Sequence, residues 1–336
     1  MAKVSIIIPN YNREQLIGET IQNMLNQSLR PYEVIVIDDG STDNSVNVIR
    51  SFGEEVTLIQ QANQGPGAAR NKGLAIATGD YIQFMDSDDL ASVNKLEVQV
   101  EALEKFQADM AYSPWAKAYI HNQSALLQDH ILQKHPLPDS LSVLEWFLSG
   151  WSTTLQTCLF SRKILQKVIP FRTDLMIWED GDLLARLFSL RPKIIFVESC
   201  LTLYRLHNCQ KLTESGSSEL RRLQDKVAIY PNLWQILNNY NSDVNWYVRL
   251  NFGLDAWQLS NAIQEYDSFS IKEINQIREL WQFYPSFVWY LLLYFKRAMI
   301  RFRWQITGSR WTIAYRSGFP SMSDRKLIEN MGLKID

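Results

Sequence analysis

The chain has 336 residues, of which 46% are hydrophobic and 21% are charged, and its formal net charge is −2 at pH 7. This is the composition of an ordinary globular protein with a sizeable core, and the length alone predicts one large domain or two. A net charge so close to zero gives no overall field that would favour nucleic acid, so we expect no nucleic-acid partner.

The cysteines, the N-terminal stretch and the apolar runs weigh against a disulfide-rich, a secreted and a membrane-spanning protein. Cys158, Cys200 and Cys209 are too widely spaced for a disulfide framework or a C-x-x-C zinc site, which fits a reducing, cytoplasmic compartment. The N-terminal "MAKVSIIIPNYN" lacks the shape of a signal peptide because its apolar run stops at Pro9. The longest apolar stretch, "FVWYLLLYF" at 287–295, is far shorter than the roughly 18 residues of a transmembrane helix.

The first third of the chain alternates apolar strands with amphipathic helices. The predicted strands are "KVSIIIP" (3–9), "EVIVID" (33–38), "VTLIQ" (56–60) and "DYIQFMD" (80–86). Helices are predicted between and after them, over 16–25, 44–52, 65–79 and 94–106. Strands that are apolar throughout and alternate with helices predict an α/β fold with a mainly parallel sheet, covered by helices on both faces.

The rest of the chain is less regular. Candidate strands are "DMAYSP" (109–114), "AKAYIH" (116–121) and "QTCLF" (156–160), and candidate helices cover 140–149 and 180–190. Beyond about residue 217 the chain is mainly helical and aromatic, and the polar "TESGSSE" at 213–219 marks a boundary. We therefore predict an α/β domain over 1–215 and a mainly helical C-terminal region over 216–336.

Polar clusters follow each of the first strands. They are "PNYN", "DDGSTD", "NQGPG" and "DSDD". Because ligands bind at the carboxyl ends of the strands in parallel sheets, four such loops at one edge predict a ligand site there.

The cluster "DSDD" crowds Asp86, Asp88 and Asp89 into four positions. Carboxylates this close repel one another unless a cation, a helix N-terminus or solvent offsets their charge. A helix N-cap would need only one aspartate. The excess favours a site for Mg²⁺ or Mn²⁺, which prefer oxygen ligands.

The two preceding loops allow both a structural and a functional interpretation. In "DDGSTD", Gly40 suits a turn with positive φ and Ser41 or Thr42 could cap the next helix, while Asp39 could accept a hydrogen bond from a nucleobase. "NQGPGAARNKG" fits neither standard phosphate-loop pattern, which weighs against a nicotinamide enzyme. Arg70 in this segment is either a phosphate ligand or a surface cation.

Acidic residues recur in "WEDGDLLARL", which holds Glu179, Asp180 and Asp182. Acidic residues at a helix start are favourable with the helix dipole, so they need no functional role. The apolar segment before them could, however, shelter one carboxylate and raise its pKa into the working range of a base. His207, in "YRLHN", is taken alone more simply explained as a structural histidine.

Taken together and in this order, these stretches resemble the inverting family 2 glycosyltransferases with the GT-A fold. The matching parts are "VSIIIPNYN", "EVIVIDDGSTD", "NQGPGAARNKGLAIATGDYIQFMDSDD", "CLFSRKIL…IPF", "WEDGDLLARL" and "YRLH". The resemblance covers about residues 3–208. It implies that 1–215 is a GT-A catalytic domain and that "DSD" is the D-x-D motif of the family.

The resemblance also implies roles for single residues. The nucleotide-sugar would be bound by Pro9, Tyr11, Asp39, Asn63, Arg70 and Asp86. The metal ligands would be Asp88 and His207, and the catalytic base would be Asp180. On the acceptor side lie Trp178 and Glu179.

The activity implied is metal-dependent, inverting transfer of a hexose from a nucleoside-diphosphate sugar, with a UDP-sugar favoured, to an acceptor hydroxyl. The cofactor would be Mn²⁺ or Mg²⁺, and the acceptor a glycan or a lipid-linked molecule in glycan or polysaccharide biosynthesis. Two alternatives stay open: a sugar nucleotidyltransferase and a non-catalytic sugar-nucleotide-binding protein. Release of nucleoside diphosphate from a sugar nucleotide would separate the three.

The stretch 285–323 has six basic residues and no acidic one, interleaved with aromatic residues. This composition predicts peripheral contact with the inner face of the cytoplasmic membrane. The alternative is a helical subdomain whose aromatic residues pack on the catalytic domain or on a second subunit, which leaves homo-oligomerisation open.

Overall fold

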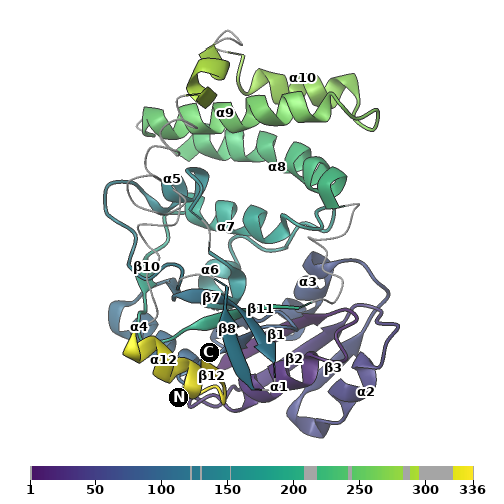
Figure 1. Ribbon diagram of the computed structural model, residues 1–336, viewed down its shortest axis with the longest axis vertical. Coiled ribbons are helices and arrows are strands. Elements are labelled where there is room, and N and C mark those ends of the chain that lie inside the picture. The colour runs from purple at the N-terminus through teal and green to yellow at the C-terminus, as the bar shows by residue number, and fades with distance from the viewer. Residues whose placement is uncertain are drawn as a thin grey trace.

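The computed structural model describes residues 2–121, 123–128, 131–151, 153–207, 218–240, 244–282, 288–294 and 321–335. Within these ranges the chain forms a seven-stranded sheet, a five-stranded sheet and a stack of helices that lies above the seven-stranded sheet in Figure 1. The predicted α/β architecture with a helical C-terminal region is confirmed.

The seven-stranded sheet has the order β10-β6-β9-β4-β1-β2-β3. Its parallel half consists of β1 (Val4–Asn10), β2 (Glu33–Asp38), β3 (Thr57–Gln60) and β4 (Tyr81–Phe84). The other half consists of β9 (Cys158–Ser161), antiparallel to both neighbours, β6 (Met110–Tyr112) and β10 (Ile194–Phe196). The parallel half places the ends of β1, β2 and β3 at one edge, as the sequence predicts.

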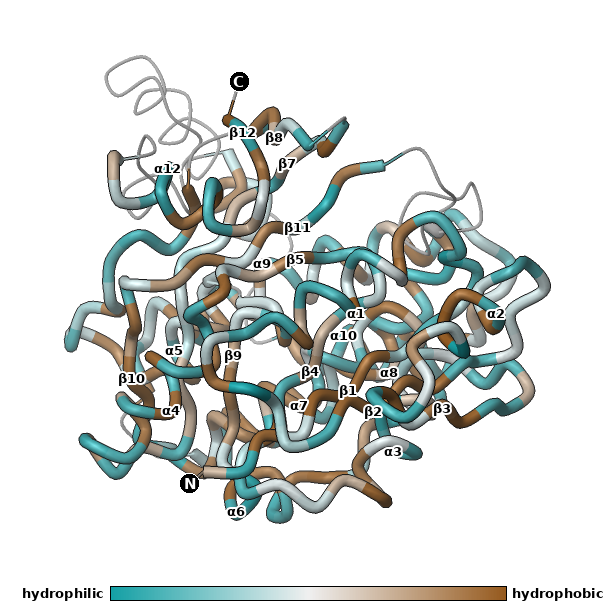
Figure 2. Tube along the Cα trace, turned by 90° about the horizontal axis from the view of Figure 1, so that it is seen from below, coloured by the Kyte–Doolittle hydropathy of each residue, from teal (hydrophilic) through white to brown (hydrophobic). Residues whose placement is uncertain are grey.

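Helices cover both faces of this sheet. The first four are α1 (Ile17–Leu25), α2 (Ser45–Arg50), α3 (Pro66–Ile76) and α4 (Lys95–Phe106). Side chains alternate between the faces of a strand, so Ile7 of β1 packs in one core with α3 residues while Ile6 and Ile8 pack in a second core with α1. Strands β1, β2 and β4 are largely buried, whereas β3 at the sheet edge is partly exposed, and β1 and β2 appear as hydrophobic segments in the interior of Figure 2.

A second sheet was not predicted. Its order is β12-β8-β7-β11-β5, formed by β12 (Lys334–Ile335), β8 (Ser124–Leu127), β7 (Trp115–His121), β11 (Thr202–Leu206) and β5 (Leu90–Ala91). Its core contains Ile328 of α12 (Met322–Glu329), so the last described segment packs against the α/β part of the chain, beside β8 and β7 in Figure 2. The two-residue strands and their distant partners leave no periodic signal in the sequence.

The remaining helices join the sheets to the C-terminal region. They are α5 (Val143–Leu148), α6 (Arg162–Leu165), α7 (Glu179–Ser189), α8 (Ser218–Tyr240), α9 (Trp246–Ile263) and α10 (Ile271–Glu279), with short 3₁₀ turns at Gly53–Glu55 and Leu155–Thr157 and a helical stretch over 288–294. In the described part of the chain, no helix has the length and apolar character needed to cross a membrane.

Two structural interpretations of the acidic loops are wrong. "DSDD" does not cap a helix, because β5 follows it directly and α4 begins only at Lys95, with Asn94 as its N-cap. Neither Ser41 nor Thr42 caps α2, whose N-cap is Asn44. The hydroxyl of Ser41 instead donates to Asp38.

Candidate active site

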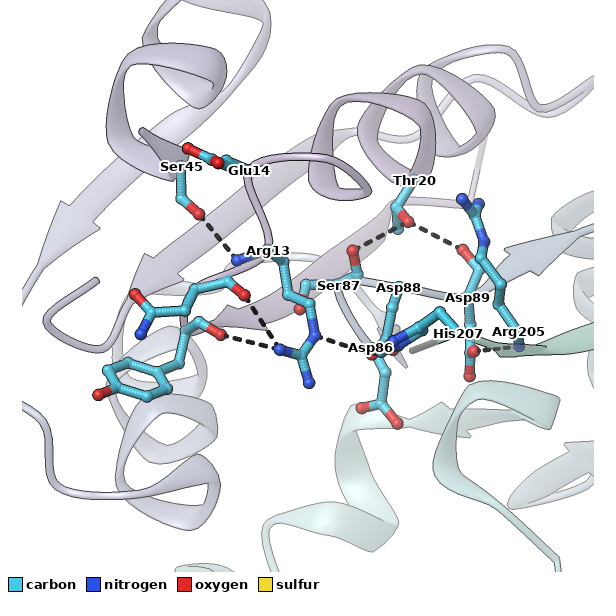
Figure 3. Close-up of polar contacts among 12 residues, drawn as sticks. Arg13, Glu14, Thr20, Ser45, Asp86, Ser87, Asp88, Asp89, Arg205 and His207 are labelled. Carbon is cyan, nitrogen blue, oxygen red and sulfur yellow. Dashed lines mark hydrogen bonds and ion pairs between the residues drawn. The ribbon is translucent and has the colours of Figure 1, made fainter. Parts of the chain in front are cut away.

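Asp88 lies between two donors that come from distant parts of the chain. Arg13, in the loop after β1, donates from Nε to Asp88 Oδ2 at 3.0 Å, and His207, just after β11, places Nε2 3.0 Å from the same oxygen (Figure 3). Burial would raise the pKa of Asp88, but the hydrogen bond from His207 and the charge of Arg13 outweigh it, and the pKa is lowered. Asp88 is therefore a carboxylate at neutral pH, beside the histidine that the resemblance pairs with it.

Asp89 has a structural role that its neighbours do not share. It is fully buried, and its carboxylate accepts from Gln156 Nε2 at 2.5 Å and from the backbone N–H of Arg205 at 2.8 Å. Burial, with the charges of Asp88 and Asp86, raises the pKa of Asp89 well above its ordinary value. Asp89 thus ties the motif to β11, the strand that leads to His207.

The backbone of the same loop is held by α1. Thr20 Oγ1 donates to the carbonyl of Ser87 at 3.2 Å and lies 3.0 Å from that of Asp89, as Figure 3 shows. One hydroxyl has a single proton, so the two carbonyls share it. This contact fixes the loop that presents Asp88.

Asp86 faces a different group. Arg70 of α3 donates to Asp86 Oδ1 at 2.9 Å and to Glu179 Oε1 at 2.7 Å, at the start of α7. Burial would lower the pKa of Arg70, but the charges of Asp86 and Glu179 outweigh it and raise the pKa. The alternative of a surface cation is therefore wrong: the guanidinium is buried and joins α3 to the loop after β4 and to α7. The binding of the nucleotide-sugar by Arg70 stays a prediction.

The two acids at the start of α7 have raised pKa values. Burial and the charge of Asp180 raise the pKa of Glu179 to about 7, against the opposing charge of Arg70. Burial raises the pKa of Asp180 as well, again opposed by Arg70, while its Oδ1 accepts from the Gly181 N–H at 2.6 Å. A carboxylate with a raised pKa at a site edge is suited to accept a proton.

Asp39 organises the loop after β3. Its carboxylate accepts from Gln61 Nε2 at 2.8 Å and from the backbone N–H groups of Gln64 at 2.9 Å and Gly65 at 2.8 Å. Gly40, with φ of +79°, allows the close approach, since a Cβ there would lie 2.9 Å from the backbone nitrogen of Asn63. The predicted turn at Gly40 is confirmed, and the contact of Asp39 with a nucleobase stays a prediction.

The other predicted residues are distributed along the same edge. Pro9 is half-buried near the end of β1. Tyr11 directly follows that strand and is 42% exposed, and Asn63 is exposed in the loop after β3. Trp178 is the N-cap residue of α7, with Lys226 of α8 5.9 Å from its ring centroid. Their roles remain predictions.

Sequence reasoning missed two residues that shape the site. Arg13 directly follows the polar cluster "PNYN", so a cation next to a loop at the sheet edge was the available signal. Gln156 lies in a short 3₁₀ turn far along the chain and had no such signal. It donates to Asp89, so it acts on the motif only through the folded structure.

The donor set at Asp88 fits a divalent cation in part. Asp88 and His207 offer an oxygen and a nitrogen that meet at 3.0 Å. Among the residues that the structure describes, no group of three or more His, Cys, Asp and Glu side chains is arranged to hold a metal ion. Mg²⁺ commonly takes one or two carboxylates and fills its other positions with substrate phosphates and water, so an incomplete protein site is compatible with such an ion.

Comparisons with known proteins bear on the family and the fold. Residues 5–169 match the family described as glycosyl transferase family 2. A curated relative, an uncharacterised glycosyltransferase of Nostoc sp., is 27% identical over 84% of this chain and 90% of its own length.

Solved structures share the fold. TarS of S. aureus in complex with UDP-GlcNAc is 17% identical, with a TM-score of 0.58 over 83% of this chain and 79% of that one. The mannosyltransferase PcManGT of Pyrobaculum calidifontis, in complex with GDP-Man and Mn²⁺, is 17% identical, with a TM-score of 0.54 over 98% of this chain and 86% of that one. The predicted resemblance is confirmed: residues 5–169 of this chain match glycosyl transferase family 2, and the chain has the GT-A fold of the solved glycosyltransferases.

Proposed function

We propose that the protein transfers a hexose from a nucleoside-diphosphate sugar to an acceptor hydroxyl with inversion at the anomeric carbon. The observation that carries this proposal is the position of Asp180. It lies at the first turn of α7, within electrostatic range of Asp86 and Arg70, and burial raises its pKa. The family match favours a transferase over the nucleotidyltransferase and non-catalytic alternatives.

Asp180 is the proposed base. Its Oδ1 is held by the Gly181 N–H, so Oδ2 is the oxygen that would take the proton from the acceptor hydroxyl. The acceptor oxygen then attacks the anomeric carbon from the face opposite the leaving nucleoside diphosphate. A well-placed base contributes roughly 10²–10⁴-fold to such a step.

Arg70 and Glu179 support the base. The Arg70 guanidinium lies between Asp86 and Glu179 and so separates carboxylates that would otherwise repel one another. Because its charge also opposes the rise in the pKa of Asp180, it helps to keep that base ionised at neutral pH.

A divalent cation, Mn²⁺ or Mg²⁺, would be held by Asp88 and His207. When bound, it would offset the negative charge of the departing diphosphate. Arg13, 3.0 Å from Asp88, orients that carboxylate from the loop after β1.

The proposed donor is a UDP-sugar. Asp39 lies at the carboxyl end of β2, between the loops that carry Tyr11 and Asn63, where a nucleobase would contact all three loops. TarS was solved with UDP-GlcNAc and PcManGT with GDP-Man, so a panel of UDP, dTDP and GDP binding would decide the nucleotide.

The direct test of the function is release of nucleoside diphosphate from a sugar nucleotide, with and without Mn²⁺ and acceptor. Product stereochemistry at the anomeric carbon tests inversion. A protein that binds sugar nucleotides but releases no diphosphate with any acceptor would contradict the proposal. Release of pyrophosphate from a nucleoside triphosphate and a sugar phosphate would instead support a nucleotidyltransferase.

A glycan or lipid-linked acceptor and peripheral membrane contact belong to the same proposal. All six basic residues of the stretch 285–323 lie outside the described residues. In its described part, Trp289 is buried and donates to the Trp281 carbonyl at 3.1 Å, whereas Tyr290 and Tyr294 are 62% and 70% exposed. One aromatic residue therefore packs inward while two face solvent.

Liposome flotation tests the membrane contact. We expect binding to vesicles with anionic lipid at low salt and its loss at high salt or when the six basic residues are changed to glutamine. A protein that stays unbound at low salt with anionic vesicles would leave the packed-subdomain interpretation.

A further inference from the structure

The segment that leads into α7 is held by a carboxylate from the helical C-terminal region. Asp225 of α8 accepts the backbone N–H groups of Met176 at 2.9 Å and of Ile177 at 2.7 Å, both on Oδ2. Asp225 is 2% exposed. A buried carboxylate oxygen that accepts two backbone N–H groups from one turn fixes that turn, because releasing it would leave that oxygen without its hydrogen bonds.

The same helix contacts this segment at two further points. Arg221 Nη2 donates to the carbonyl of Asp174 at 2.9 Å. The Lys226 ammonium lies 5.9 Å from the centroid of the Trp178 ring. Contacts therefore run from α8 to residues on both sides of Met176 and Ile177.

On its other side the segment lies against the loop that Asp39 organises. A Cβ added to Gly65 would be only 2.9 Å from the sulfur of Met176, and the Gly65 N–H donates to Asp39. The segment is thus confined between α8 and the loop after β3, three residues before Glu179.

We propose that Asp225 is a positioning residue for the base: it fixes the backbone at Met176 and Ile177 and thereby sets where Asp180 lies relative to Asp86 and Arg70. This inference rests on the proposed function of Asp180. Since misplacing a reacting group by about 1 Å can cost on the order of 10²-fold in rate, a residue that acts only through the backbone can control turnover.

The test is steady-state kinetics of Asp225→Ala, below its unfolding temperature, with donor binding measured separately. We expect kcat to fall roughly 10- to 100-fold while the affinity for nucleoside diphosphate stays within about twofold, because the neighbouring loop is held by the hydrogen bonds of Asp39, and Tyr11 and Asp88 lie on other elements. Wild-type kcat in the folded variant would overturn the proposal, whether or not donor binding is weakened.

Asp225→Asn is the conservative variant. Both N–H groups donate to a single oxygen, so the amide oxygen of asparagine can accept them in the same position once its NH2 group, which replaces Oδ1, no longer faces the Arg221 guanidinium, and the variant is therefore made in the Arg221→Gln background. We expect this variant to keep kcat within about threefold of wild type, since it retains the neutral form of both hydrogen bonds. If it turned over as slowly as expected of the alanine variant, the proposal would fail, even if Asp225→Ala could not be isolated folded.

Arg221→Gln is the matched control. Arg221 Nε lies 3.2 Å from Asp225 Oδ1, the oxygen that does not accept the backbone N–H groups, and the arginine side chain is 40% exposed. The variant removes this partly exposed ion pair and the hydrogen bond from Arg221 to the Asp174 carbonyl, and each should cost little, so we expect kcat within about twofold of wild type. A loss as large as that of Asp225→Ala would mean that the contacts of Arg221, rather than the two backbone hydrogen bonds of Asp225, hold the segment, and would overturn the positioning role.

A double variant separates this inference from the proposed function. If Asp225 acts through Asp180, then adding Asp225→Ala to Asp180→Asn should reduce the residual rate by less than about threefold, because coupled residues are not additive. Fully multiplicative losses would overturn the inference. Normal turnover of Asp180→Asn alone would contradict the proposed function instead.

Discussion

The edge of the sheet at the ends of β1, β2 and β3, where we propose that the donor binds (the donor edge), and the start of α7 are built in different ways. At the donor edge, polar groups meet partners from neighbouring strand ends: Asp38 accepts from Asn10 and Ser41, and Asp39 accepts from Gln61 and Gly65. All lie within the first third of the chain.

At the start of α7 the partners come from far apart. Arg70 pairs with Glu179 across 109 residues of sequence. Asp225 reaches back 48 residues to the Ile177 N–H. The comparison indicates that the loops proposed to bind the nucleotide follow from local patterns at the strand ends, whereas the position of Asp180, the proposed base, depends on packing between the sheet and the helical region.

Of the variants at the start of α7, Asp180→Asn should lower kcat the most. We expect kcat to fall roughly 10²–10⁴-fold with little change in donor affinity, since a general base is removed and the donor loops are untouched. The measurement is single-turnover kinetics with a binding assay for nucleoside diphosphate. Normal turnover would mean that the base lies elsewhere, and Glu179 would be the next candidate.

Asp182→Asn is the matched control for Asp180→Asn. Asp182 is buried on the same helix and accepts from Arg186 Nε at 2.7 Å, so its loss should lower stability and leave kcat of the folded protein unchanged.

The pH profile adds a second test of the base. Asp180 must be ionised to accept a proton, so kcat is lost as the pH falls through its pKa. Burial raises that pKa, which places the acid limb above the ordinary aspartate value of 3.8.

Glu179→Gln should alter how stability depends on pH. Burial raises the pKa of Glu179 from 4.5 to about 7, so between these values the folded chain binds more protons than the unfolded chain. The free energy of unfolding therefore falls as the pH rises through this window, by about 3 kcal/mol from this group. Glutamine does not titrate, so the variant should lose this slope.

Denaturant midpoints measured from pH 4.5 to pH 8 would check this expectation. Glu101→Gln, at an exposed position of α4, is the control and should keep the wild-type slope. Equal slopes for all three proteins would contradict the assignment.

Asp88→Ala tests whether nucleoside-diphosphate binding depends on a metal ion held by Asp88. We expect Mn²⁺ to strengthen nucleoside-diphosphate binding to the wild type but not to the variant, with a loss of roughly 10- to 100-fold in the presence of the metal. Without metal the two proteins should bind alike, since Asp88 is then no longer a ligand. Wild-type transfer that survives excess chelator would rule out the metal dependence.

The predictable part of the molecule is the part with unbroken local patterns. Strands β1 to β4 are continuous apolar runs, so their limits follow from the sequence to within a residue or two. The second sheet could not be predicted, because Leu90 of the two-residue β5 pairs with Leu203, more than a hundred residues later. The aspartates of "DSDD" were recognised as a group, but their division into a structural Asp89 and a site-facing Asp88 depends on partners that only folding brings near.

Gly40→Ala gives the smallest expected effect and tests the donor edge itself. Gly40 has φ of +79°, and an added Cβ would lie 2.9 Å from the Asn63 nitrogen and 3.3 Å from the Gln61 carbonyl oxygen. Strain of this kind costs on the order of 1–3 kcal/mol, and it would push away the loop that Asp39 holds. We therefore expect both a lower unfolding midpoint and weaker nucleoside-diphosphate binding.

Gly53→Ala is the control that isolates the steric contribution of Gly40. Gly53 also has a positive φ, of +57°, but an added Cβ would meet nothing within 4 Å. It should cost about 1 kcal/mol from the backbone conformation alone and leave nucleotide binding unchanged. If the two alanine variants bound nucleoside diphosphate equally well, the contact between the Gly40 turn and the loop after β3 would have no part in donor binding. Donor binding would then be assigned to Tyr11, Asp88 and their immediate neighbours alone.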